Sequence, residues 1–513
     1  MKPLSKNEKF LMPITPKLQI MQKKGGMGIG LFCLCLLLLY FPSPSNADTS
    51  SISLAPSSVS NSNSSPQSTT NSTINDVINN KKKDDEVNQQ VSSGAAKYTD
   101  ADFEIWKKSF KQEVLERGIK ASVFEKALGS VKFDPNVIKL DSDQPEFTRN
   151  IWDYIDNATS KKRIKKGRAL LRKYKKLFDK IEEEYGVQRE IILAIWAMES
   201  DFGRNYGKNN ILRSLATLAY HGKRADFAKE ELLAALSMIQ KRKLSPKKLI
   251  GSWAGAMGQP QFMPSSYLRY AVDYNNDNKV DLWKSLPDIL ASIANFLAES
   301  GWRRGEDWGV EVKLPRDFDW RLNSSAYELR YFQWKMRGVE QANGKPYKHL
   351  QRLATLFIPA GRFGPVFLVT HNFNILKSYN KSTSYVLTIA LLSELFAGGE
   401  SNQIAWPRDD KALSHDQITE LQLRLTIAGH DPGKADGKIG SKTREAIRTW
   451  QLEQDLPGDG YANNDLLQLL IKNSEAKIKA NKNKVDEADE AKADEAKVDE
   501  AKLDEVIPDE NKD

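Results

Sequence analysis

One glutamate, Glu199, occupies a position at which the helical spacing of its neighbours predicts an apolar residue. It continues a stripe of Ile192, Ile195 and Trp196, whose spacing places all four side chains on one face of a helix. Burying a carboxylate is costly unless it is paired or protonated, and burial raises its pKa toward the range a general acid needs. The stripe therefore predicts either a catalytic acid or a buried ion pair, for which Arg204 is a nearby partner.

A second segment, residues 251–267 (GSWAGAMGQPQFMPSSY), combines small residues, two prolines and aromatic residues. This composition is typical of a loop whose backbone lies against a ligand, although the same glycines also serve tight helix packing. Ser252 and Gln261 supply hydrogen-bonding groups. Three aromatic side chains of the segment could stack on sugar faces: Trp253, Phe262 and Tyr267.

The rest of the chain offers little support for other chemistries. Glycosidases normally need two carboxylates, and Asp201 points off the helix face that carries Glu199. There is no Gly-x-Ser-x-Gly or His-Glu-x-x-His motif. The chain has two cysteines, Cys33 and Cys35, and five scattered histidines, which excludes a disulfide scaffold and a cysteine-rich zinc module.

Polar residues alternate over Asp273–Asp281 (Asp, Asn, Asp, Lys, Asp) and resemble the first three-quarters of an EF-hand loop. However, Asn278 replaces the glycine of the sixth position, and Lys284 stands where a bidentate glutamate closes such a site. We therefore favour a polar turn over a calcium site, and the sequence predicts no cofactor.

Three patterns of apolar residues surround these motifs. From about residue 100 to 240 the apolar spacing is helical, and between 305 and 370 it changes to the alternation of strands. Residues 412–472 have the pattern of three short helices separated by glycine-containing turns. The sequence thus predicts a mainly α protein with a small β-containing insertion and a small three-helix domain.

Ordered motifs between about residues 103 and 399 resemble the lytic murein transglycosylases of the B type. They are AIWAMESDFGR (194–204), NNILRSLATLAY (209–220), the segment 251–283, PDILASIANFLAESGW (287–302), ATLFIPAG (354–361) and NFNILKSYNKSTSY (372–385). Residues 412–472 resemble a common peptidoglycan-binding module. The resemblance implies a lysozyme-like catalytic domain that cleaves peptidoglycan between N-acetylmuramic acid and N-acetylglucosamine.

The same resemblance implies roles for single residues. Glu199 matches the catalytic acid and base, and further residues match positions of the substrate cleft: Ser252, Gln261, Arg224, Tyr379 and Asn380. Two positions depart from the family pattern, since Phe296 stands where tyrosine is usual and Lys223 where a second arginine is common. Both departures concern contacts with the substrate.

A single residue that acts first as an acid and then as a base is sufficient for a lytic reaction. In this reaction, Glu199 protonates the glycosidic oxygen and then deprotonates the C6 hydroxyl of the same muramic sugar. The product is a 1,6-anhydromuramic end. Two alternatives stay open at this point. The chain could be a hydrolytic muramidase that uses a second carboxylate such as Asp201, or a wall-binding scaffold without activity.

The ends of the chain predict export. Residues 1–47 have the order of a signal peptide, with a basic region, an apolar run and Ser45-Asn46-Ala47, although an uncleaved membrane anchor is the alternative. Residues 48–98 are predicted to be a disordered Ser/Asn/Thr-rich linker, and residues 473–513 a disordered acidic tail of DEAKx repeats. Between them we expect a catalytic domain at 99–400, an interdomain linker at 400–411 and a peptidoglycan-binding domain at 412–472.

The net charge of the chain is +9, with Lys+Arg 76 and Asp+Glu 67. The folded part is more basic than the total because the tail is acidic, and a basic surface suits an anionic partner. For a periplasmic protein we expect peptidoglycan as that partner and no nucleic acid. Transient contacts with the membrane or a wall-synthesis complex are possible, and a monomer is expected.

Overall fold

The structure is a computed structural model that describes residues 99–142, 150–324, 326–400, 402–476 and 479. The predicted signal peptide and linker, both cysteines and most of the acidic tail lie outside these residues. Within them, none of the helices combines the length and apolar character needed to cross a bilayer.

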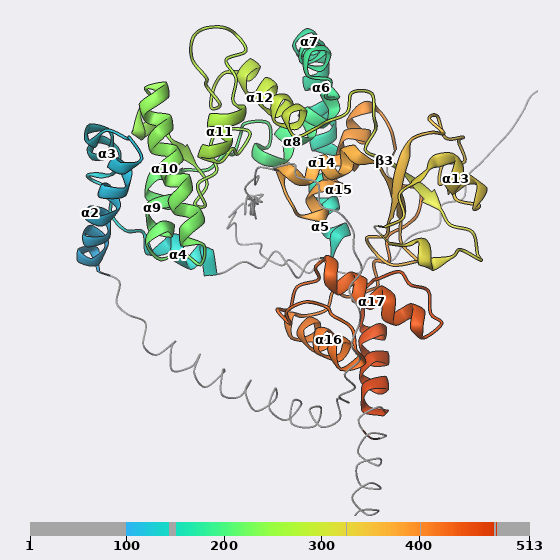
Figure 1. The fold of residues 1–513 in the computed structure, drawn as a ribbon. Helices are drawn as coiled ribbons and strands as arrows, with labels where there is room; N and C mark the ends of the chain where they lie inside the picture. Colours follow the sequence, from blue (N-terminus) through green and yellow to red (C-terminus); the bar gives the residue numbers. More distant parts are fainter. Residues whose placement is uncertain (1–98, 143–149, 325, 401, 477–478, 480–513) are drawn as a thin grey trace, which may run out of the picture. The chain divides into compact units, whose positions relative to one another are not determined.

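Helices form most of the described chain (Figure 1). Those before residue 300 are α2 (Asp100–Glu116), α3 (Ala121–Leu128), α4 (Pro135–Ser142), α5 (Ile151–Ala158), α6 (Lys161–Lys173), α7 (Lys175–Tyr185), α8 (Arg189–Ser200), α9 (Ile211–His221), α10 (Ala225–Arg242), α11 (Pro264–Tyr270) and α12 (Leu286–Glu299). Those after it are α13 (Tyr331–Met336), α14 (His371–Tyr379), α15 (Thr383–Ala397), α16 (His415–Ala428) and α17 (Ser441–Glu453). Short 3-10 turns occupy Pro246–Lys248 and Trp320–Leu322.

Helix α8 lies at the centre of the helical part. All of its residues from Ile191 to Ser200 are buried, and it packs against α6, α7, α12 and α15. A helix covered on every side is apolar on every side, which explains its run of isoleucine, leucine and alanine. The helix ends at Asp201, whose φ of 50° is left-handed. Glu199 therefore sits in the last turn of the most enclosed helix of this region.

The predicted β-containing insertion is confirmed as a five-stranded antiparallel sheet in the order β4-β6-β7-β3-β5. Its strands are β3 (Gly309–Lys313), β4 (Leu329–Arg330), β5 (Glu340–Gln341), β6 (Leu353–Phe357) and β7 (Val366–Val369). Trp334 of α13 is fully buried against the sheet and donates its indole N–H to the carbonyl of Ala354 over 3.0 Å. A separate two-stranded pairing joins β1 (Asn209–Asn210) to β2 (Ile250–Gly251).

The expected three short helices of the C-terminal region are α16, α17 and the helical residues 464–476. They enclose a core of their own that includes Leu421, Ile447 and Trp450. The buried amide of Gln422 supports the turn between α16 and α17, because it accepts from the N–H of Gly437 and donates to the carbonyl of Lys438. The mainly helical fold class with a small β insertion is thus confirmed.

The stretch expected to link the two regions has specific contacts of its own. Trp406 is buried, and its ring lies 6.3 Å from that of Trp152 in α5. Arg408 pairs with Asp156 of the same helix at 2.6 Å. Trp406 and Arg408 therefore pack along α5, whereas the N–H groups of Gln403 and Ile404 donate to Glu311 of β3.

Candidate active site

The carboxyl group of Glu199 meets a phenol from a distant part of the chain. Its Oε1 accepts a hydrogen bond of 2.6 Å from the hydroxyl of Tyr385, which is fully buried in α15. Ser382 caps α15 by accepting from the N–H of Tyr385 over 3.3 Å, so the first turn of the helix holds the tyrosine in place. Glu199 itself is 5% exposed. The pair couples a buried carboxyl group to a neutral hydrogen-bond donor.

The carboxylate two residues further on has different partners. Asp201 pairs with Arg204 and, at 3.9 Å, with Arg163 of α6. Its side chain is 25% exposed. The arginine considered above as a partner for Glu199 is therefore engaged with Asp201.

The loop that follows β2 folds back on itself beside α8. Met257 and Phe262 exchange backbone hydrogen bonds of 2.8 and 3.1 Å, and the turn between them needs left-handed residues at Gly258 and Gln261. A Cβ on Gly258 would lie 2.7 Å from the carbonyl oxygen of Leu282, so the close approach requires glycine.

A glutamine clamps this turn to the helix of Glu199. Gln259 accepts from the indole N–H of Trp196 over 2.8 Å and donates to the carbonyl of Trp283 over 2.7 Å. Trp196 stands one turn before Glu199 on α8. The loop and the carboxyl group are thus positioned against one another by the same helix.

Two of the predicted cleft residues lie in this loop and are buried. The hydroxyl of Ser252 accepts from the N–H of Ala256, and the amide of Gln261 donates to the carbonyls of Tyr206 and Gly258. Both side chains therefore hold the backbone of the loop.

Two further predicted residues join the same group from the end of α14. The hydroxyl of Tyr379 donates to the carbonyl of Pro260 over 2.6 Å, directly before Gln261. Asn380 accepts from the N–H of Ser382, the residue that caps α15 at Tyr385. The structure thus brings Gln261, Tyr379 and Asn380 to the surroundings of the Glu199–Tyr385 pair.

Arg224 lies at the start of α10 and forms an ion pair with a residue of α4. Its guanidinium is 3.8 Å from the carboxylate of Asp141, which also accepts from the N–H of Lys223 over 3.0 Å. Burial lowers the pKa of the Arg224 guanidinium, and the charge of Asp141 acts in the opposite direction. Asp141 thus fixes the turn that carries both basic residues.

The three aromatic side chains of the loop, for which stacking on sugars was one of two interpretations, are buried. Phe262 and Tyr267 are 2% and 1% exposed, and Trp253 is 7% exposed. The hydroxyl of Tyr267 donates to the buried carbonyl of Val280. These rings fill the core behind the loop. Phe296 does the same, with its ring 4.8 Å from that of Tyr379.

The side chains of the EF-hand-like loop are bonded within the loop. Asp273 and Asn275 both accept from the N–H of Asp277, which in turn accepts from the N–H of Lys279. The buried Asp288 of α12 accepts from the N–H of Tyr274 and Asp281 at 3.0 Å, which the sequence did not suggest. In the described part of the chain no three His, Cys, Asp or Glu side chains are grouped as metal ligands. The expectation that no calcium binds here stays a prediction.

Sequence reasoning also missed Tyr385 as the partner of Glu199. The only signal was its place as the last residue of the motif NFNILKSYNKSTSY. The two residues are 186 positions apart, and no periodic pattern relates positions in separate helices.

The region that contains Glu199 and Tyr385 also matches a known protein family. A family model described as the transglycosylase SLT domain matches residues 102–394, more than half of the chain. The chain belongs to the SLT transglycosylase family. A second model, described as a putative peptidoglycan binding domain, matches residues 414–470.

The chain is also similar in sequence to a lytic transglycosylase of known name. Membrane-bound lytic murein transglycosylase B of Escherichia coli is 31% identical over 240 residues, which is 46% of this chain and 64% of that protein. The match therefore spans less than two thirds of that relative's length.

Solved structures of two Pseudomonas aeruginosa proteins are also similar. SltB3, solved in complex with NAG-anhNAM-pentapeptide, is 44% identical, with a TM-score of 0.69 over 72% of this chain and 99% of that one. SltB1, a soluble lytic transglycosylase, is 26% identical, with a TM-score of 0.51 over 57% of this chain and 98% of that one.

Proposed function

We propose that this SLT family member is a lytic transglycosylase that cleaves the bond between N-acetylmuramic acid and N-acetylglucosamine in peptidoglycan without water. The observation that carries the proposal is the buried carboxyl group of Glu199, hydrogen-bonded to Tyr385 within the matched region. A buried carboxyl group with a neutral donor can hold and release one proton, as an acid that later acts as a base must do.

The reaction proceeds in two steps at one carboxyl group. Glu199 first gives its proton to the glycosidic oxygen, the C1–O bond breaks, and the N-acetyl group of the muramic sugar stabilises the positive charge at C1. Glu199, now a carboxylate, then takes the proton of the C6 hydroxyl, whose oxygen bonds to C1. The ring closes as a 1,6-anhydro sugar, Glu199 is protonated again, and no cofactor is needed.

The surroundings of Asp201 argue against hydrolysis with a second carboxylate. A retaining or inverting hydrolase needs that group free to attack the sugar or to activate water. Asp201 is instead paired with Arg163 and Arg204. The complex of SltB3 with a fragment named NAG-anhNAM supports the anhydro product.

The remaining parts of the chain have supporting roles in this proposal. The backbone shaped by Ser252 and Gln261, together with Arg224, Tyr379 and Asn380, forms the cleft that holds the glycan. Residues 414–470 bind peptidoglycan and keep the enzyme on its substrate. The chain acts in the periplasm as a monomer after export by residues 1–47, with membrane attachment through that segment as the alternative.

Mass spectrometry of digested peptidoglycan tests the reaction directly. We expect muropeptides with anhydro ends, each lighter by one water than the reducing product. Reducing ends would show that the chain is a hydrolase. A complete lack of soluble fragments, with wall binding retained, would show a scaffold.

A further inference from the structure

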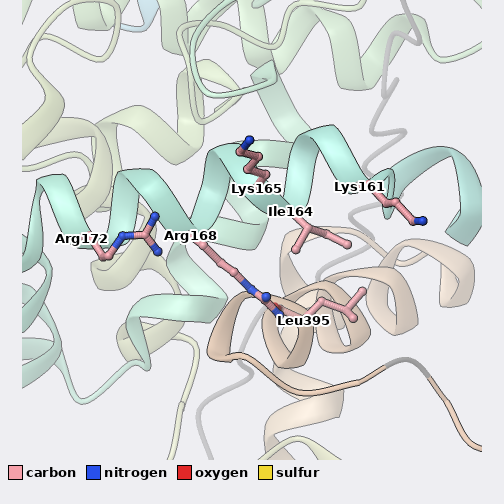
Figure 2. A pocket seen from close by; sticks show the side chains of 6 residues that line it. All are labelled: Lys161, Ile164, Lys165, Arg168, Arg172 and Leu395. Carbon is pink, nitrogen blue, oxygen red and sulfur yellow. The ribbon is translucent and has the colours of Figure 1, made fainter. Parts of the chain in front are cut away.

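Helix α6 is the most basic element of the described chain. Eight of its 13 residues are lysine or arginine, and none is acidic. Lys161, Lys165, Arg168 and Arg172 recur at helical spacing along one face, over about 16 Å. With Ile164 and with Leu395 of α15 they line a hollow of about 390 Å³ (Figure 2). We call these four cations the α6 basic face.

The described part of the chain does little to neutralise these charges. Arg168 donates twice to the carbonyl of Leu395 at the end of α15, which accounts for its place in the fold. Among the described residues, no carboxylate lies within 4.0 Å of any cation of the α6 basic face, whereas the neighbouring Arg163 meets Asp201. Lys161, Lys165 and Arg172 are exposed. Such a row of like charges suits a linear polyanion.

The chain itself contains a polyanion that no function has yet explained. Residues 485–513 hold 13 acidic and four basic residues, a net charge of −9, with paired Asp-Glu residues that repeat every five positions from Asp489 onward. If this segment is extended, successive pairs are about 17 Å apart, and if it is helical, about 7.5 Å. In either conformation, at least two Asp-Glu pairs can lie along the cations of the α6 basic face, which extend over about 16 Å.

We propose that the acidic segment 485–513 docks on the α6 basic face of the same chain. Residues 480–513 can extend over about 110 Å. Covalent attachment gives the segment an effective concentration in the millimolar range, which a lipid surface or the carboxylates of wall peptides must exceed to displace it. The docked segment thereby screens the basic face from other polyanions.

Carbodiimide cross-linking of the full chain tests the contact, because it joins a lysine amine to a carboxylate only when they touch. We expect amides between the acidic segment and Lys161 or Lys165, counted per lysine, in about fivefold excess over those to three exposed control lysines on other helices, and their loss at about 1 M salt, where the Debye length falls to about 3 Å. The control lysines are Lys108, Lys126 and Lys335. Cross-links spread evenly over both sets, or none to α6, would overturn the proposal.

A second experiment separates the segment from other occupants. A variant with the acids of 486–495 changed to Asn and Gln is compared with the unchanged chain for sedimentation with phosphatidylglycerol vesicles and with isolated sacculi. We expect the variant to gain binding severalfold and to lose that gain on Lys161→Gln, Lys165→Gln and Arg172→Gln. If the unchanged chain binds either probe through α6 as strongly as the variant does, an external polyanion is the occupant and the proposal fails.

Discussion

The last turn of α8 and the turn that follows it each present a carboxyl group, in different surroundings. Glu199 is 5% exposed and accepts a hydrogen bond from the neutral hydroxyl of Tyr385. Asp201, two residues later, is partly exposed and pairs with Arg163 and Arg204. The helix ends at Asp201, which has a left-handed backbone and a side chain that is 25% exposed.

This difference shows why one of two neighbouring acids suits proton transfer. A buried carboxyl group hydrogen-bonded to a neutral donor can hold and release a proton, whereas the carboxylate of Asp201 is engaged in ion pairs with two arginines. Substitutions at each carboxyl group and at its neighbours test this difference.

The largest effect is expected for Glu199→Gln. Glutamine keeps the shape of the side chain and an oxygen for the Tyr385 hydroxyl, but it cannot release a proton. We expect cleavage to fall by about 10³-fold or more. Release of soluble muropeptides measures it, with sedimentation on sacculi as the control for intact wall binding. Retained cleavage would refute the assignment of Glu199.

A smaller loss is expected for Tyr385→Phe, because Glu199 keeps its proton chemistry but loses a hydrogen bond that positions it. We expect kcat to fall about tenfold and the free energy of unfolding to fall by about 1 kcal/mol. Tyr267→Phe is the matched control, since its buried hydroxyl donates to the carbonyl of Val280. If both variants lose kcat equally, the effect of Tyr385 is structural.

A weaker effect on substrate binding is expected for Asp141→Asn. The ion pair with Arg224 is 3.8 Å long and mostly buried, so its loss frees the guanidinium without removing it. We expect KM to rise about fivefold with kcat unchanged, which corresponds to about 1 kcal/mol of binding energy. Steady-state kinetics on soluble glycan strands check this. A fall in kcat with constant KM would place Asp141 in the chemistry instead.

Glu231 is a buried carboxyl group for which we expect no role in cleavage. Its carboxylate is buried and accepts from the N–H and hydroxyl of Ser265. Burial raises its pKa above the ordinary 4.5, so the folded state binds the proton more tightly and stability is lost as pH rises through the raised pKa. Each unit of this rise corresponds to about 1.4 kcal/mol.

Glu231→Gln should flatten that part of the pH dependence, measured as urea unfolding between pH 4.5 and 7, and leave cleavage within about twofold. A pH dependence equal to that of the unchanged chain would show that Glu231 titrates alike in both states.

The smallest effect is expected for Asp201→Asn. Asparagine tolerates the left-handed conformation, and partly exposed ion pairs contribute about 0–1 kcal/mol. We expect cleavage within about twofold of the unchanged chain, with anhydro products. A loss comparable to that of Glu199→Gln would revive the hydrolytic alternative with Asp201 as the second carboxylate.

The local pattern of the sequence was sufficient for much of the fold. The apolar spacing around α8, the alternation before β7 and the turns between α16 and α17 are properties of neighbouring residues, so they predicted the helices, the sheet insertion and the small C-terminal domain. The same spacing singled out Glu199, because a carboxylate inside an apolar stripe is visible without any tertiary contact.

Only the tertiary structure decided which groups meet that carboxyl group. Composition suggested that Phe262 and Tyr267 face a sugar, but the fold turned them into the core, since their large apolar surface is better buried there. Tyr385 reaches Glu199 because α15 packs along α8. Such a contact depends on how two helices cross, and helix spacing within either segment carries no information about that crossing.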